Sequence, residues 1–215
     1  MRFLKYAFGS SIGRKQVVAL SGLLLIGFLA SHLTGNLLIY LGAEKFDSYA
    51  AFLSNHPLLI PAEIGLAALF LVHIGWGLRV SIQNRFARGR DYEMNENEGG
   101  RTIGSSTMKY TGLMTLIFLG VHIFTFKIQH ASGTSLWEHV IDWFHVAPYT
   151  AFYLIAMVSL GLHLSHGIKS AFQTFGFNHP RYTPCIEGVG LVLAIAFAVG
   201  FGLLPVFGFT RGGAL

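Results

Sequence analysis

The chain has little charge and a single cysteine. Of its 215 residues only 12% are Asp, Glu, Lys or Arg, whereas 53% are hydrophobic. So few charges are not typical of a soluble domain of this length. The lone Cys185 excludes an internal disulfide and an iron–sulfur cluster held by this chain, and no C-x-x-C-H motif offers covalent haem attachment. The composition instead predicts a membrane protein.

Five apolar segments are long enough to cross a bilayer as α-helices, which takes about 20 residues each. They cover residues 17–41, 58–82, 108–128, 148–172 and 188–209. We therefore predict an all-α membrane protein, a single transmembrane domain over residues 1–215 with five helices in a bundle. The connection 42–57 is expected to be a loop. In the connection 129–147, Ser135 and Glu138 have the spacing of a capping box, which predicts a short interfacial helix.

The basic residues give this bundle a direction. Twelve of the fifteen Lys and Arg lie at or near the N-terminus and the second and fourth connections. The other three, Lys45, Lys127 and Arg211, fall on the opposite side. Basic residues concentrate on the cytoplasmic side of membrane proteins. The N-terminus is therefore predicted to be cytoplasmic, and the net charge of +5 needs no nucleic-acid partner to explain it.

Four histidines lie within four of the apolar segments. His32 and His73 are 41 residues apart (73 − 32), and so are His122 and His163 (163 − 122). An ionisable side chain inside a bilayer is costly and indicates a functional role. Each histidine also has a glycine nearby, which lets a flat ligand approach the helix backbone; these glycines are Gly35, Gly75, Gly77, Gly120, Gly161 and Gly167.

The direction of each helix converts sequence position into depth. His32 and His122 lie about 15 residues along helices that run outward, so both fall in the outer half of the bilayer. His73 and His163 lie at similar positions on helices that run inward, so both fall in the inner half. The two levels differ by roughly 10 Å along the membrane normal. Two pairs of imidazoles at two depths are the axial ligands that two haems require.

Two questions stay open at the level of sequence. His166 lies three residues from His163, on roughly the same helix face, and is an alternative ligand or a hydrogen-bond partner beside the inner haem. A haem-free anchor or transporter with histidines in a proton path is the competing interpretation. A di-haem arrangement with two ligands on each of two helices does not fit, because no segment carries two histidines 13–14 residues apart.

Three stretches of sequence resemble a known family. They are SSIGRKQVVALSGLLLIGFLASHLTGNLLIY, FDSYAAFLSNHPLLIPAEIGLAALFLVHIGWGL and LGLHLSHGIKSAFQTFG. The chain resembles the cytochrome b558 subunit of succinate dehydrogenase/fumarate reductase, a five-helix di-haem membrane anchor, over nearly its whole length. The resemblance implies two haems b, with His32 and His122 on the outer one and His73 and His163 on the inner one.

The resemblance also implies partners and a location. A flavoprotein and an iron–sulfur subunit are expected to dock on the cytoplasmic face of the bacterial inner membrane. Electrons would pass between them and a quinone, expected to be menaquinone, through the two haems. Dicarboxylate chemistry would belong to the flavoprotein, because this chain offers no active site for it.

A quinone site needs a protonatable group, since quinones exchange protons together with electrons. Glu63, about five residues inside the second segment at its outer end, is the best candidate for this proton relay. The expected environment is apolar and buried. Arg79 and Lys169 are candidate contacts for the propionates of the inner haem, with Lys127 and His130 as outer equivalents.

Overall fold

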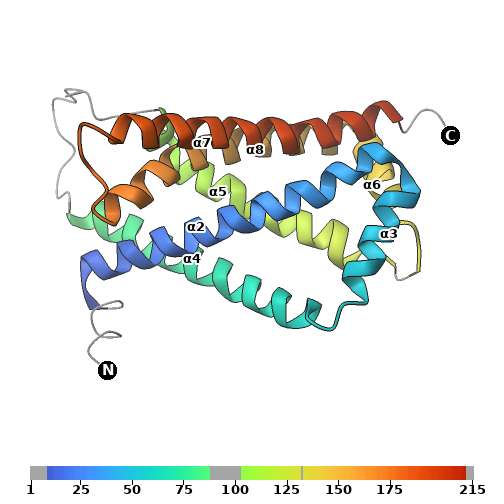
Figure 1. Ribbon diagram of the computed structural model, residues 1–215, viewed down its shortest axis with the longest axis horizontal. Coiled ribbons are helices and arrows are strands. Elements are labelled where there is room, and N and C mark those ends of the chain that lie inside the picture. The colour runs from blue at the N-terminus through green and yellow to red at the C-terminus, as the bar shows by residue number, and fades with distance from the viewer. Residues whose placement is uncertain (1–8, 88–102, 132, 212–215) are drawn as a thin grey trace.

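The computed structural model describes residues 9–87, 103–131 and 133–211, which form helices joined by turns (Figure 1). Five long helices run along the long axis of the molecule: α2 Ser11–Asn36, α4 Leu59–Ala87, α5 Ile103–Ile123, α7 Ala147–Thr174 and α8 Thr183–Arg211. Each is long and apolar enough to cross a membrane. The prediction of an all-helical fold with five helices of membrane-spanning length is confirmed for the described residues.

The long helices extend beyond the predicted segments. Helix α2 begins at Ser11 rather than at residue 17, because the Ser10 hydroxyl accepts a hydrogen bond from the Gly13 amide at 2.9 Å and caps the first turn. Two short helices continue the long ones without a break. The 3₁₀-helix η1, Leu37–Leu41, follows α2, and the π-helix η2, Phe124–Ile128, follows α5.

Two further helices close one end of the bundle, which we call the α6 end. Helix α6, Leu136–His145, is the predicted short helix, and the Ser135 hydroxyl caps it by accepting from the Glu138 amide at 3.1 Å. Helix α3, Ala43–Ser54, lies where a loop was expected, so that prediction is wrong. Asp47 of α3 accepts hydrogen bonds from the Ser135 hydroxyl at 2.6 Å and the Trp137 amide at 2.8 Å. This tertiary contact joins α3 to the start of α6.

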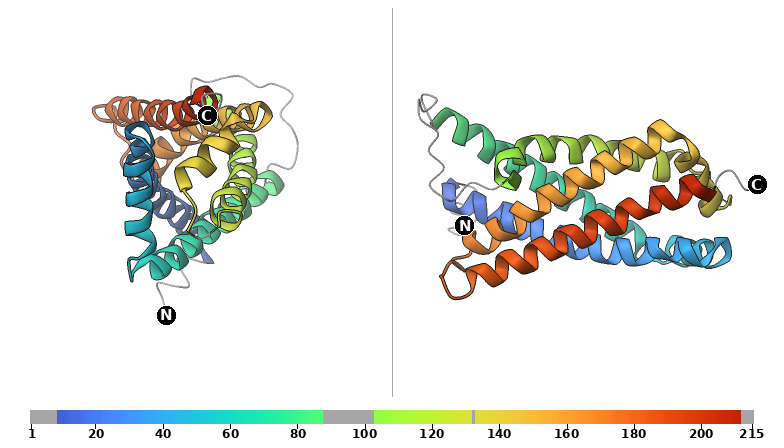
Figure 2. Two further views of the ribbon diagram at one scale, coloured as in Figure 1. Left: turned by 90° about the vertical axis from the view of Figure 1, so that its right-hand side faces the viewer. Right: turned by 90° about the horizontal axis from the view of Figure 1, so that it is seen from above.

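The helices differ in how deeply they are packed. Helix α7 contributes the most buried side chains and contacts α8, α5 and α2, with Gly161 lying directly against Ala198 of α8. Such close approach of small residues is the usual way in which membrane helices associate. Helix α4 packs chiefly on α2, which it crosses (Figures 1 and 2), and none of its described side chains is buried. One long apolar helix therefore lies at the edge of the bundle.

Helix α2 begins at one end of the molecule and α8 ends at the other, as an odd number of crossings requires (Figure 1). Which end faces the cytoplasm stays a prediction from the charges. The polar connection between the second and third segments falls largely on residues 88–102, which lie outside the described residues.

Candidate metal centres: two histidine pairs

The first pair of histidines lies toward the α6 end. His32 is near the C-terminal end of α2, and His122 is the penultimate residue of α5. Their ring centroids are 5.7 Å apart, and the ring planes are nearly perpendicular at 89°. Both side chains are partly buried. Helices α2 and α5 thus bring together two imidazoles that are 90 residues apart in sequence (122 − 32).

Aromatic rings surround this first pair. Phe28 stacks on His32 with centroids 5.2 Å apart, one helical turn before it, and Phe201 of α8 lies 5.8 Å from the same ring. Phe118 and Phe126 each lie 5.5 Å from His122, one turn before and one turn after it. The surroundings are therefore apolar and largely built from rings four residues away on the same helix.

Polar contacts reach the first pair from two sides. The Tyr153 hydroxyl of α7 lies 3.1 Å from His122 Nδ1, and the Tyr149 hydroxyl lies 3.0 Å from that of Tyr153. On the other side, the Asn36 amide donates to the His32 carbonyl at 2.8 Å and lies 3.4 Å from His32 Nε2. The sequence offered Asn36 only as a weaker candidate for the quinone site. No sequence pattern singled out Tyr153 and Tyr149, because they lie on a separate helix.

The second pair comes from α4 and α7. The rings of His73 and His163 have centroids 6.4 Å apart and planes at 78°. His73 Nδ1 lies 3.1 Å from the Ser21 hydroxyl and 3.2 Å from the Val18 carbonyl, both on α2. The carbonyl can only accept, so it favours a proton on Nδ1 and leaves Nε2 free to bind a metal.

Glycines face the second pair from neighbouring helices. A Cβ placed on Gly22 of α2 would lie 3.1 Å from His73 Cε1, and one on Gly112 of α5 would lie 3.4 Å from His163 Cε1. The glycines named from the sequence behave differently. Gly35 and Gly161 pack against Tyr49 and Ala198. Such a Cβ would meet no atom of the described residues within 4 Å at Gly75, Gly77, Gly120 and Gly167. Sequence proximity therefore missed Gly22 and Gly112, the glycines that face His73 and His163.

His163 and His166, the two candidate ligands on α7, lie in different surroundings. His163 faces His73, and its Nδ1 atom is buried and finds no hydrogen-bond partner among the described residues. His166 is partly buried and packs against Gly104 at the beginning of α5, where a glycine Cβ would lie 3.2 Å from His166 Cβ. The structure thus places His163 opposite His73. Ligation itself stays a prediction.

The two pairs fit a haem better than a metal ion held by protein alone. Over the described ranges, which omit residues 1–8, 88–102, 132 and 212–215, no three His, Cys, Asp or Glu side chains are grouped as a metal site. A porphyrin supplies four nitrogen ligands, so two imidazoles complete its iron. Two features of the second pair favour such a group. His163 Nδ1 is buried with no hydrogen-bond partner among the described residues, and the glycines beside the pair leave room for a flat ring.

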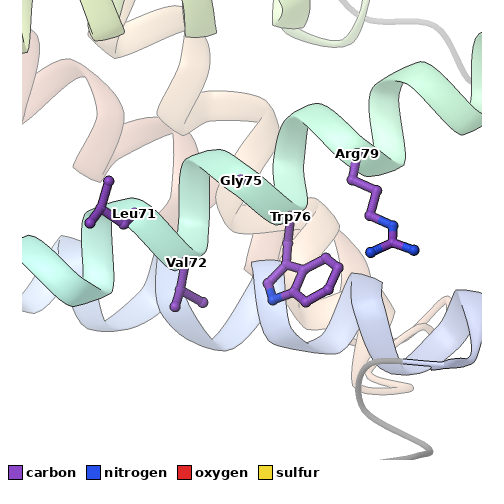
Figure 3. Close-up of a pocket in the computed structure, with 5 residues that line it drawn as sticks. All are labelled: Leu71, Val72, Gly75, Trp76 and Arg79. Carbon is purple, nitrogen blue, oxygen red and sulfur yellow. The ribbon is translucent and has the colours of Figure 1, made fainter.

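Arg79 lines a shallow groove of about 400 Å³ on α4, together with Leu71, Val72, Gly75 and Trp76 (Figure 3). Its guanidinium carbon lies 5.1 Å from the centroid of the Trp76 ring, a cation–π contact. Arginine beside tryptophan is typical of the membrane–water interface. The predicted propionate contact of Arg79 stays a prediction.

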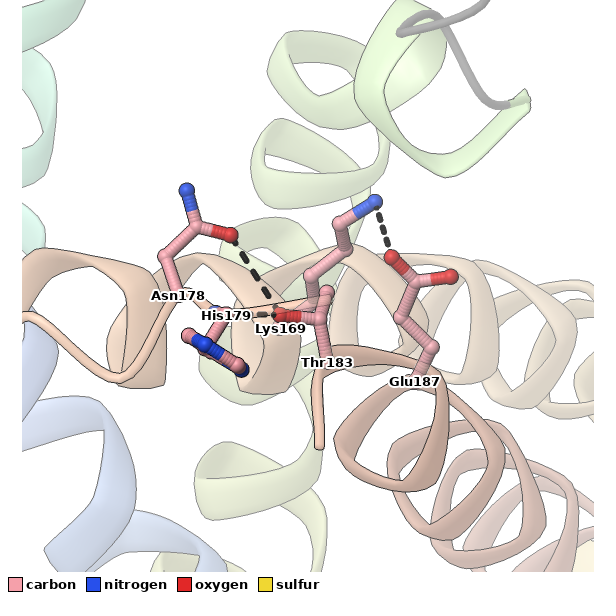
Figure 4. Close-up of polar contacts among 5 residues, drawn as sticks. All are labelled: Lys169, Asn178, His179, Thr183 and Glu187. Carbon is pink, nitrogen blue, oxygen red and sulfur yellow. Dashed lines mark hydrogen bonds and ion pairs between the residues drawn. The ribbon is translucent and has the colours of Figure 1, made fainter. Parts of the chain in front are cut away.

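Lys169 forms an ion pair with Glu187 of α8 at 2.6 Å (Figure 4). In the nearby turn between α7 and α8, the Thr183 hydroxyl accepts from the His179 amide at 2.9 Å and donates to the Asn178 side-chain oxygen at 3.3 Å. Lys169 therefore already neutralises a carboxylate. Its predicted propionate contact is not tested by this pairing.

Glu63 differs from the expectation of a buried carboxylate. Its side chain is 42% exposed, and it forms an ion pair with Lys127 of η2 at 2.5 Å. The expectation failed because α4 packs chiefly on α2 and lies at the edge of the bundle, so that none of its described side chains is buried. The pair links α4 to the segment that follows His122. The sequence predicts Lys127 only as a propionate contact of the outer haem.

Comparison with known proteins supports the resemblance. The chain is similar to the succinate dehydrogenase cytochrome b558 subunit of Bacillus subtilis (strain 168), with 26% identity over 200 residues. The similar region makes up 91% of this chain and 96% of that protein. The resemblance to the cytochrome b558 subunit is confirmed. No protein-family model matches the chain, and no solved structure matches it.

Proposed function

We propose that this chain is the di-haem cytochrome b membrane anchor of a succinate dehydrogenase or fumarate reductase. The observation that carries the proposal is the pairing of four intramembrane histidines across different helices, with centroids 5.7 Å and 6.4 Å apart. His32 and His122 would hold the outer haem b, and His73 and His163 the inner one. The haems supply one-electron transfer between an iron–sulfur partner and membrane quinone.

The chain's own residues orient the imidazoles. On the inner pair, the Val18 carbonyl and Ser21 hydroxyl hold the Nδ1 face of His73 toward α2. On the outer pair, the aromatic rings around His32 and His122 keep water away from the site. The hydrogen bonds to His73 and the rings stacked on His32 and His122 fix the rotation of these ligands before a metal binds, which reduces the conformational entropy lost on binding.

Haem content and optical spectra of the purified complex test this proposal. We expect two haems b per chain, b-type bands in the reduced-minus-oxidised spectrum, and co-purification of a flavoprotein and an iron–sulfur subunit from the bacterial inner membrane. A complex without b-type bands would overturn the proposal. That result would favour the competing function, a haem-free anchor or transporter with a histidine proton path.

We further propose that Glu63 relays protons for a quinone, expected to be menaquinone, near the outer haem. Its ion pair with Lys127 supports this role, because a carboxylate beside a lysine at the membrane edge can exchange a proton with water while staying near the bilayer. The α6 end also carries Tyr40, Glu44 and Asp47, but none of them makes an ion pair with a basic side chain among the described residues.

Glu63→Gln tests the relay, with Glu187→Gln as the matched control, because Glu187 is the carboxylate of the other ion pair. Glu63→Gln should lower quinone-linked turnover by about two orders of magnitude, the usual contribution of a general acid–base group. Haem content and succinate oxidation with a water-soluble acceptor should not change. Equal loss in both variants, or no loss in Glu63→Gln, would contradict the role.

A further inference from the structure

Tyr153 lies in the interior, only 4% exposed, between His122 and a second tyrosine. Its hydroxyl is 3.1 Å from His122 Nδ1 and 3.0 Å from the Tyr149 hydroxyl. Phe118 and Phe144 pack edge-on against its ring with centroids 4.9 Å and 5.0 Å away. The position of the phenol oxygen is therefore fixed by packing on both sides.

Ligation would determine the direction of this hydrogen-bonded chain. A neutral imidazole that binds a metal through Nε2 carries its proton on Nδ1. Nδ1 of His122 must then donate, so the Tyr153 oxygen accepts. In the structure the Tyr149 hydroxyl donates to the Tyr153 oxygen at 3.0 Å. Because a phenol oxygen can also accept, ligation would reverse this bond so that Tyr153 donates to Tyr149. The chain then runs from His122 through Tyr153 to Tyr149, and each bond polarises the next.

We propose that Tyr153 and Tyr149 are positioning residues that tune the outer haem through His122. This inference rests on the proposed function. A hydrogen bond from Nδ1–H raises the basicity of the imidazole, and a more basic ligand stabilises the oxidised iron. The two tyrosines therefore lower the midpoint potential of the haem held by His32 and His122.

No tyrosine hydroxyl bonds to the inner pair within the part of the chain that the structure describes. His73 Nδ1 is satisfied by a serine hydroxyl and a backbone carbonyl, and His163 Nδ1 has no partner among the described residues. The inference thus predicts an effect confined to one haem. A general loosening of the fold would not produce such a selective change.

Tyr153→Phe and Tyr149→Phe in the whole complex test the inference, with Tyr110→Phe as the control. Tyr110 is 76% exposed on α5, so its substitution makes the same chemical change on the surface of the bundle. Potentiometric titration followed by optical spectra would give both midpoints. The outer haem is identified by the bands that a His32→Ala variant loses.

Tyr153→Phe should shift the outer midpoint upward and leave the inner one unchanged. Tyr149→Phe should shift it in the same direction by less, and Tyr110→Phe should shift neither.

Unchanged midpoints in both test variants, with both haems bound, would overturn the inference and leave the proposed function intact. If Tyr153→Phe loses the outer haem, Tyr149→Phe decides: an upward shift supports the inference and no shift overturns it. Wild-type complex without haem would instead overturn the proposed function.

Discussion

The two histidine pairs have the same ligand type but opposite surroundings. Rings from α2, α5 and α8 enclose His32 and His122, and a phenol reaches His122 from α7. Glycines and a serine lie beside His73 and His163 instead. Bulky rings fill the space around His32 and His122, whereas glycines leave space free beside His73 and His163. Different kinds of substitution should therefore damage each pair.

The largest effect should follow removal of a ligand. His73→Ala should abolish the inner haem and largely spare the outer one, and His32→Ala should do the reverse, because each imidazole belongs to one pair. Haem b per chain and difference spectra of the purified complex measure this. Equal loss of both haems in a stable variant would show that the pairs are assigned wrongly.

The next largest effect should come from filling the space beside His73. Gly22→Val would place a branched side chain where a Cβ alone lies 3.1 Å from the His73 ring, so the ring must move and the inner haem should be lost or weakly bound. The control is Gly27→Val on the same helix, where a Cβ meets nothing within 4 Å. If Gly22→Val and Gly27→Val lost the inner haem to the same extent, the space beside His73 would not be what the inner haem requires.

A smaller effect is expected from Ser21→Ala. This change removes the hydroxyl 3.1 Å from His73 Nδ1 but leaves the Val18 carbonyl at 3.2 Å to accept the same proton. We expect both haems to be retained and only the inner midpoint to rise, by less than the outer midpoint rises in Tyr153→Phe. Redox titration of the two variants side by side measures the difference. A shift confined to the outer haem would refute this prediction.

The smallest effect concerns the loop before α6, where the His130 ring lies 5.1 Å from that of His139 on α6. Burial is the main cause that lowers the pKa of His130, with neighbouring His139 adding to it and Asp47 acting in the opposite direction. The folded state therefore binds fewer protons than the unfolded state just below the ordinary pKa of 6.5. Stability from this group is complete above pH 6.5 and is lost as the pH falls toward the lowered pKa.

Thermal unfolding of the complex between pH 5 and 7 measures this contribution. His130→Gln, which cannot become charged, should lose less stability than the wild type as the pH falls. Identical pH dependence in the two proteins would exclude a role for His130. The outer haem band, followed in the same scans, would report whether the loop affects the first pair.

The sequence by itself determined the five long helices, the short capped helix α6 and the two histidine pairs. Long apolar runs can only be helical in a bilayer, and helix direction converts position into depth, so local information suffices. Tertiary structure alone decided that α3 is a helix joined to α6 through Asp47, and that Glu63 pairs with Lys127. It also decided which groups surround each histidine. Gly22, Gly112 and Tyr153 lie on neighbouring helices, and their contacts depend on helix rotation and packing, which no local pattern encodes.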